Sequence, residues 1–149
     1  MNPSDTVAEW LTALLHGDVD TAWTLTDPTQ RLVFAQAWIL ARDRPIISDE
    51  HRDGFAQAIC DRSYDAVWPR FSSWLTSTLG AVFAPYRAGW RLVGEPVPVA
   101  VDLEVVHLHP IGGTAGAVTV RHTLDGCRVA GIGPYLPVPG WPPTTEALV

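Results

Sequence analysis

Three histidines in the second half of the sequence carry the side chains best suited to proton transfer. His107 and His109 are separated by one residue, so they share a face if this segment is a strand. His122 lies in a later strand-like segment and is expected to face the same side. Histidine titrates near neutral pH, which makes His107 and His122 candidate general acids or bases. Three imidazoles on one surface also suit a transition metal, but no carboxylate is clearly placed on that face, and no metal site is predicted.

Two carboxylates form a second candidate for acid–base chemistry. Asp102 and Glu104 are expected to share the opposite face of the strand that carries His107. Paired carboxylates serve acid–base reactions, so Asp102 is a candidate catalytic residue. Arg121 and Arg128 are expected on one outward face of the neighbouring hairpin. Cross-strand ion pairs among these four charges are the favoured interpretation.

Aromatic side chains are the third notable group, because the 149 residues include seven tryptophans. Some of them must fill the core. Others are candidates to line a pocket for a flat apolar ligand, with the indole N–H as an orienting donor and tyrosine hydroxyls as further donors. The candidate ligand-binding residues are Trp10, Trp23, Trp38, Trp74, Tyr64 and Tyr86.

The two cysteines do not mark a metal or redox site by their spacing. Cys60 and Cys127 are far apart and lack a CxxC motif, and Asp61 beside Cys60 disfavours its thiolate. The sequence also lacks a Gly-rich phosphate loop, a GxSxG motif and an HExxH motif. These observations disfavour nucleotide-driven, serine-hydrolase and zincin chemistry, and no cofactor is predicted.

Composition limits the class of protein. The chain is 47% hydrophobic and 17% charged, which suits one globular domain. Its formal charge is −6, and its ten basic residues, all arginine, are scattered among carboxylates. Binding to nucleic acid or to an anionic membrane surface is therefore disfavoured. No apolar run approaches the roughly 18 residues of a membrane span, and no secretory signal follows Met1, so we expect a cytoplasmic protein with reduced cysteines.

The first half of the sequence has helical periodicity. Ser4 is expected to cap a helix that ends near Gly17, and a short helix follows from Asp18. The segment Asp27–Pro28 predicts the start of a third helix, which runs to about residue 41. The longer segment 45–62 is expected to hold a short helix after a cap at 48–50. A further helix is expected from Pro69 to Gly80, with Tyr64, Val67 and Trp68 in a turn before it.

After Gly89 the period changes to two, which indicates strands. A short strand is expected at 90–93, a turn at 94–96 and a second strand at 97–109. Two more alternating segments, 117–124 and 127–132, are joined by Asp125–Gly126, which fits a type I′ hairpin. That register pairs His122 with Val129.

Helices followed by an antiparallel sheet within one domain define an α+β protein. At this point the sequence resembles the nuclear transport factor 2-like superfamily, the cystatin-like α+β cones that include the SnoaL-like branch. The resemblance rests on three motifs: Val7-x-x-Trp10-Leu11-x-x-Leu14-x-x-Gly17-Asp18, Ala22-Trp23-x-Leu25-x-Asp27-Pro28 and Val118-x-Val120-x-His122-x-x-Asp125-Gly126-x-Arg128-Val129-Ala130-Gly131. It implies N-terminal helices on a strongly curved C-terminal sheet over residues 1–133, with an apolar cavity between them. Residues 134–149 depart from it as a proline-rich arm, with Tyr135, Leu136 and Trp141 docked on the body.

Several functions remain open, because fold alone does not select among them. We expect a small-molecule-binding domain with an aromatic-lined pocket for a small apolar or aromatic molecule. One alternative is a cofactor-free isomerase, cyclase or hydrolase that uses a histidine or aspartate. A second is a protein-interaction module, and the resemblance implies a homodimer formed through the exposed face of the sheet.

Overall fold

The computed structural model describes residues 1–42 and 50–144, and within these ranges the protein is α+β, as predicted. Helices make up the first half and four antiparallel strands the second. The elements in chain order are α1 (Pro3–Leu15), α2 (Val19–Thr24), α3 (Pro28–Leu40), α4 (Arg52–Cys60), α5 (Trp68–Val82), the 3₁₀-helix η1 (Ala84–Ala88), β1 (Trp90–Ala100), β2 (Leu103–Pro110), β3 (Gly116–Thr123) and β4 (Gly126–Ile132).

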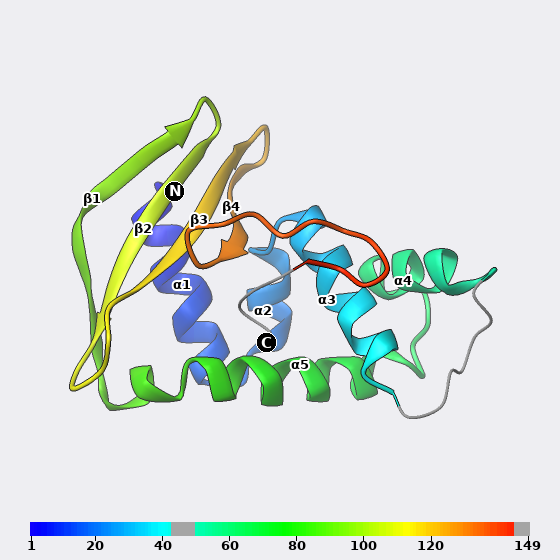
Figure 1. The fold of residues 1–149 in the computed structure, drawn as a ribbon. Helices are drawn as coiled ribbons and strands as arrows, with labels where there is room; N and C mark the ends of the chain where they lie inside the picture. Colours follow the sequence, from blue (N-terminus) through cyan, green and yellow to red (C-terminus); the bar gives the residue numbers. More distant parts are fainter. Residues whose placement is uncertain (43–49, 145–149) are drawn as a thin grey trace.

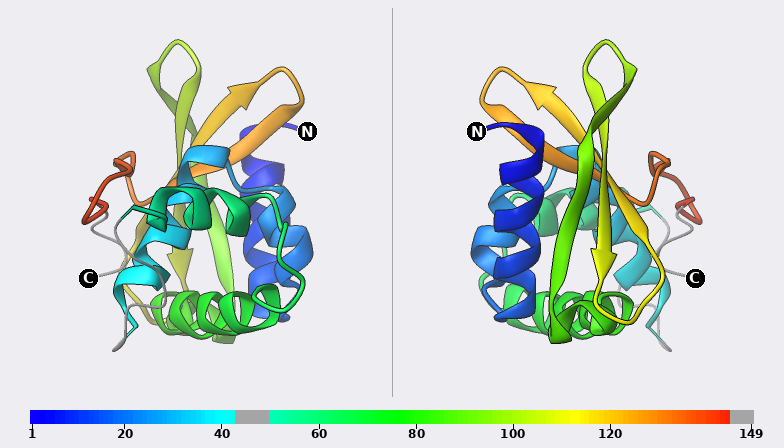
Figure 2. Two further views of the ribbon diagram at one scale, coloured as in Figure 1. Left: turned by 90° about the vertical axis from the view of Figure 1, so that its right-hand side faces the viewer. Right: turned by 90° about the vertical axis from the view of Figure 1, so that its left-hand side faces the viewer.

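The helices surround one face and one end of the sheet. Figures 1 and 2 show α1 against the sheet, whereas α5 crosses at its lower end in the view of Figure 1. Helix α3 packs beside β4 and on α5, and α4 packs on α3. No helix in the described part of the chain is long and apolar enough to cross a membrane.

Within the described residues, two of the five α-helices start at the predicted capping residues. Asp18 accepts from the Thr21 N–H, and Asp27 accepts from the Thr29 N–H in front of Pro28. The prediction for α1 is wrong by two residues, because Asn2 rather than Ser4 is the cap and Pro3 occupies the first turn. Helix α4 confirms a helix in the segment 45–62. Its predicted cap at 48–50 is wrong, because His51 is the N-cap; residues 48 and 49 lie outside the described residues.

Helix α5 begins and ends slightly outside its predicted range. The turn before it is confirmed, since the Tyr64 carbonyl accepts from the N–H groups of Val67 and Trp68. The predicted stop at Gly80 is wrong, because Gly80 lies inside the helix and Phe83 is its C-cap. A single glycine costs a helix only about 1 kcal/mol, which packing of the flanking turns offsets.

The strands form a meander in the order β1-β2-β3-β4, and two boundaries differ from the prediction. Residues 94–96 lie within β1, where pairing is irregular between Val93 and Val97, rather than in a turn. Gly94 has a φ of 67°, and Pro96 has no N–H to donate, so the strand absorbs these residues as a bulge. The chain reverses instead at residues 101–102, which divides the predicted strand 97–109 between β1 and β2.

The predicted β3–β4 register is wrong by two residues. Thr123 pairs with Gly126, which makes Leu124 and Asp125 the loop and sets His122 opposite Cys127 instead of Val129. A type I′ turn needs positive φ at both loop residues, yet only Gly126 of this turn has it, at 112°. The Thr123 hydroxyl closes the loop, because it donates to the Gly126 carbonyl at 2.6 Å and accepts from the Asp125 N–H at 3.2 Å.

The shift of two residues leaves the predicted faces of this hairpin intact, because side chains alternate with a period of two. Arg121 and Arg128 are paired on one face, as expected. The face toward the helices carries fully or almost fully buried side chains: Val106, Leu108, Val118, Val120 and Val129.

Aromatic rings fill the space between α2, α3 and α5. Phe71 of α5 is their centre, with four indole rings at centroid distances of 5.3 to 6.1 Å: Trp23, Trp38, Trp68 and Trp74. Edge-to-face and tilted contacts of this kind add about 0.5–1.5 kcal/mol per pair beyond the area buried. Most of the predicted aromatic set therefore stabilises the helical layer.

The chain after β4 returns over the helices, so that residues 134–144 pass above α3 toward α4 (Figure 1). The Gly140 N–H donates to the Gln36 side chain at 3.0 Å, and the Trp141 indole donates to Asp53. Of the three residues expected to dock, Trp141 packs against the body, whereas Tyr135 and Leu136 are exposed. The end of the arm at 145–149 lies outside the described residues.

Candidate functional site

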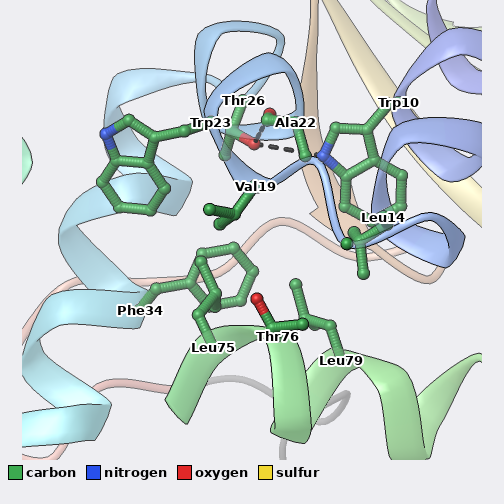
Figure 3. A pocket seen from close by; sticks show the side chains of 11 residues that line it. Trp10, Leu14, Val19, Ala22, Trp23, Thr26, Phe34, Leu75, Thr76 and Leu79 are labelled. Carbon is green, nitrogen blue, oxygen red and sulfur yellow. Dashed lines mark hydrogen bonds between the residues drawn. The ribbon is translucent and has the colours of Figure 1, made fainter. Parts of the chain in front are cut away.

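An apolar cavity lies among α1, α2, α3 and α5 (Figure 3). It has a volume of about 10 Å³ for a water-sized sphere, which is roughly the room that one water molecule needs. Its eleven lining residues all come from these helices and the adjoining turns: Trp10, Leu14, Gly17, Val19, Ala22, Trp23, Thr26, Phe34, Leu75, Thr76 and Leu79. We expected an apolar hollow between the helices and the sheet, but this cavity lies among the helices. The space between α1 and the sheet is filled by the sheet-facing side chains of α1 and by the buried valines of the sheet.

Every polar side chain in the cavity wall has a partner. The Trp10 indole donates to the Thr26 hydroxyl at 3.1 Å, and that hydroxyl donates to the Ala22 carbonyl at 2.7 Å (Figure 3). The Thr76 hydroxyl donates to the Ser72 carbonyl at 2.8 Å. None of the eleven lining residues is ionisable. The wall therefore offers an apolar surface without an acid, a base or an unpaired donor.

Only Trp10 and Trp23 of the six predicted ligand-binding residues line this cavity. Trp38 is buried against Phe71, and Trp74 is half-buried beside the same ring. Both therefore serve the aromatic cluster rather than the cavity.

The two tyrosines also lie elsewhere. Tyr86 of η1 is buried edge-to-face against Phe83 at 5.4 Å, and burial raises the pKa of its hydroxyl. Tyr64 is exposed and packs against Phe55 in front of α5. Neither hydroxyl is directed into the cavity.

The predicted catalytic residues do not converge on one surface. His107 is exposed on the sheet face away from the helices, together with His109, whereas His122 alternates with Arg121 and lies on the same face as Val120. The expectation that all three histidines share a face is wrong, because the β2–β3 register pairs His107 with Ala117. Ala117 lies on the face of Arg121, whereas the next residue, His122, points to the opposite face. The described residues contain no group of three or more His, Cys, Asp or Glu side chains that could hold a metal ion.

Asp102 and Glu104 do not form a pair. Asp102 lies in the turn before β2, and its carboxylate accepts from Arg121 at 2.9 Å. Arg121 also lies 3.4 Å from the carboxylate of Asp27, which is buried. Glu104 belongs to the opposite face and contacts His122. Of the four charges expected to form cross-strand ion pairs, only Asp102 and Arg121 do so. The expectation is wrong for Glu104 and for Arg128, which donates to the carbonyls of Cys127 and Asp125.

The sheet instead assembles a cluster that the sequence analysis missed, formed by Glu104, His122 and Cys127. Cys127 Sγ lies 3.5 Å from His122 Nδ1, and His122 Nε2 is hydrogen-bonded to a Glu104 carboxylate oxygen. The three residues come from the adjacent strands β4, β3 and β2. The signal that could have revealed the cluster is Thr123 before the loop, because a closing Thr123–Gly126 pair places His122 directly opposite Cys127.

The other cysteine has a different environment. Cys60 ends α4 and is buried, and burial, followed by the nearby charge of Asp61, raises the pKa of its thiol to about 12. Both cysteines are free, as the sequence predicted. Cys60 therefore remains a neutral, inert thiol at neutral pH.

Comparison with models of known protein families, with curated proteins and with solved structures gives no match. The resemblance to nuclear transport factor 2-like proteins stays a prediction from the sequence. Function is therefore inferred from the geometry of the two sites, the apolar cavity and the Glu104–His122–Cys127 cluster.

Proposed function

We propose that this protein binds a small apolar molecule in the cavity among α1, α2, α3 and α5. The observation that supports this proposal is a wall whose polar groups are all paired internally and which carries no ionisable side chain. An apolar guest gains about 25 cal/mol for each Å² removed from water and breaks no hydrogen bond on entry. The same wall lacks the acid or base that a proton-transfer enzyme needs, so binding is favoured over turnover at this site.

The volume of about 10 Å³ sets how binding proceeds. A guest larger than a water molecule must push side chains aside, and we propose that α2 is the part of the wall that moves. This helix has only six residues, so its position depends on packing rather than on its own stability. Val19 at its first turn and Thr76 opposite are half-buried, and an outward shift of α2 enlarges the space between them.

The resemblance to cone-shaped α+β domains is part of the same proposal. Bulges bend the strands in which they occur. Irregular pairing in β1 and between Thr119 and Val120 supports a sheet that curves around α1. A reducing cytoplasmic location is likewise proposed, and the two free cysteines support it.

A pair of matched variants tests the binding proposal. Ala22 lines the cavity, whereas Ala56 is a buried alanine of α4 away from it. Ala22→Leu overpacks and closes the cavity, and Ala56→Leu overpacks a different site. We expect benzene or indole to change the tryptophan fluorescence of the wild type and of Ala56→Leu, and binding to weaken at least tenfold in Ala22→Leu. Equal affinities for both variants, or no binding by the wild type, would contradict the proposal.

A second candidate function is association with another copy through the tip of the β1–β2 hairpin. Val97, Val99 and Val101 are exposed there at alternate positions, and Val97 and Val99 belong to the edge strand β1. Pro96 and Pro98 in β1 lack the N–H needed for edge pairing, so the proposed contact buries the valine side chains rather than adding a strand. We expect sedimentation to show a dimer that Val99→Lys converts to a monomer. A monomeric wild type over the accessible concentration range refutes this function.

A further inference from the structure

The cluster at the β3–β4 hairpin has the order of groups found in activated thiols. A nucleophile, Cys127, faces a base, His122, and the base faces a carboxylate, Glu104. The cross-strand register fixes this order, because His122 is the direct partner of Cys127 and Glu104 is the partner of Val120, two residues along the same face. Backbone pairing rather than a chance surface contact therefore holds the three side chains together.

The carboxylate determines which imidazole nitrogen is free. A carboxylate only accepts hydrogen bonds, so the proton of neutral His122 resides on Nε2, which faces Glu104. Nδ1 then carries a lone pair toward the thiol at 3.5 Å. This is the arrangement in which a histidine removes a proton from a nucleophile while a third group orients it.

The cluster lies at the boundary between core and solvent. Cys127 is 5% exposed, and the side chains of His122 and Glu104 are 46% and 22% exposed. The thiol thus lies beside a half-exposed imidazole, at the edge where a small reagent approaches from solvent. Arg128 donates to the Cys127 carbonyl at 2.8 Å and so fixes the backbone beside the nucleophile.

We infer that Cys127 is a modification site that undergoes thiol–disulfide exchange with low-molecular-weight disulfides, with His122 as general base and Glu104 as the residue that positions it. Displacement at sulfur needs only a nucleophile and a group that takes up its proton, and the cluster contains both. This inference does not depend on the apolar cavity, whose walls lie on other elements.

Bonds, electrons and the proton balance among Cys127, His122 and the disulfide, without any further reactant. His122 Nδ1 takes the Cys127 proton, and the thiolate attacks one sulfur of the disulfide. A new bond joins Cys127 to that sulfur while the original S–S bond breaks. The departing thiolate takes the proton from His122, so one disulfide and one protein thiol become one mixed disulfide and one small thiol.

The test uses the full chain with a dipyridyl disulfide and with glutathione disulfide, and peptide mass spectrometry locates the adduct. We expect Cys127 to react well before Cys60, so Cys60→Ser retains the rate and Cys127→Ser loses it. His122→Asn is expected to lower the rate about a hundredfold, the lower end of what positioned proton transfer contributes. His109→Asn, on the other face of the sheet, is expected to react like the wild type.

Two further measurements separate base catalysis from simple shielding. Glu104→Gln keeps an acceptor toward Nε2 and is expected to retain most of the rate, whereas Glu104→Ala loses it. Amide exchange of the hairpin checks that the variants fold and open alike. The inference is overturned if His122→Asn reacts as fast as or faster than the wild type, because His122 then only covers the thiol. Equal rates for Cys60 and Cys127, or for the two Glu104 variants, overturn it as well.

Discussion

The hydrogen-bond chain in the cavity wall gives the sharpest test of how this fold is stabilised. Thr26 is buried, accepts from the buried Trp10 indole and donates to the Ala22 carbonyl. Thr26→Val keeps the shape of the side chain but removes both interactions. The indole N–H is then left in an apolar cavity wall without an acceptor.

The expected cost follows from these contacts. Each lost hydrogen bond contributes about 1 kcal/mol net, and a buried donor left unpaired costs about 1–3 kcal/mol. Thr26→Val should therefore lower the free energy of unfolding by about 2–3 kcal/mol. For a chain of this length, that corresponds to a fall in Tm of roughly 5–10 °C.

Urea unfolding followed by tryptophan fluorescence measures this loss, and Thr24→Val is the matched control. Thr24 makes the same kind of bond to the carbonyl four residues earlier, at 3.0 Å, but is exposed, so its replacement should change stability by less than about 0.5 kcal/mol. In a Trp10→Phe background the cost of Thr26→Val should fall by about 1–2 kcal/mol, because no donor is orphaned. Equal costs for the two threonine variants, or no coupling to Trp10, would refute the reasoning.

Three further predictions concern charged and titratable groups. Burial raises the pKa of Cys60 from its usual 9.0 to about 12, so the thiol ionises first in the unfolded chain. The wild type should therefore lose stability as the pH rises from about 9 toward about 12, and urea titrations should show no such loss from this group in Cys60→Ser. Hydrogen bonds from Thr21 lower the pKa of Asp18, so its stabilisation is present above pH 3.8 and lost below it; Asp18→Ala should show a shallower acid loss by circular dichroism. Arg121→Met leaves the buried Asp27 carboxylate without its guanidinium and should cost about 2 kcal/mol by urea unfolding, and an unchanged midpoint would contradict this.

Local signals predicted most of the helical layer. Asp18 and Asp27 cap the helices that they were expected to cap, because capping depends on a side chain and backbone donors only two or three residues away. The α+β class and the faces of the last hairpin followed from periodicity for the same reason. The predicted end of α5 at Gly80 is wrong, because packing of the turns on both sides of Gly80 extends the helix by two residues, to Val82.

The register of strand pairing was harder to predict from the sequence, because the alternation of side chains is unchanged when the register shifts by two residues. Arg121 and Arg128 share a face in either register, yet only one register brings His122 to Cys127. The turn decides between them, and its choice rests on the Thr123 hydroxyl and on the positive φ of Gly126. The Glu104–His122–Cys127 cluster therefore could not be derived from spacing along the chain.

The sequence by itself determined the two kinds of element, the helix starts at Asp18 and Asp27, and the alternation of the last hairpin, since each depends on neighbours within a turn of helix or along one strand. Only the tertiary structure decided which aromatic residues meet. Trp10 and Trp23 reach the cavity while Trp38 and Trp74 surround Phe71, because helix packing rather than residue type sets the direction of each ring. The same holds for the thiol, base and carboxylate, whose contact depends on three strands being brought into register.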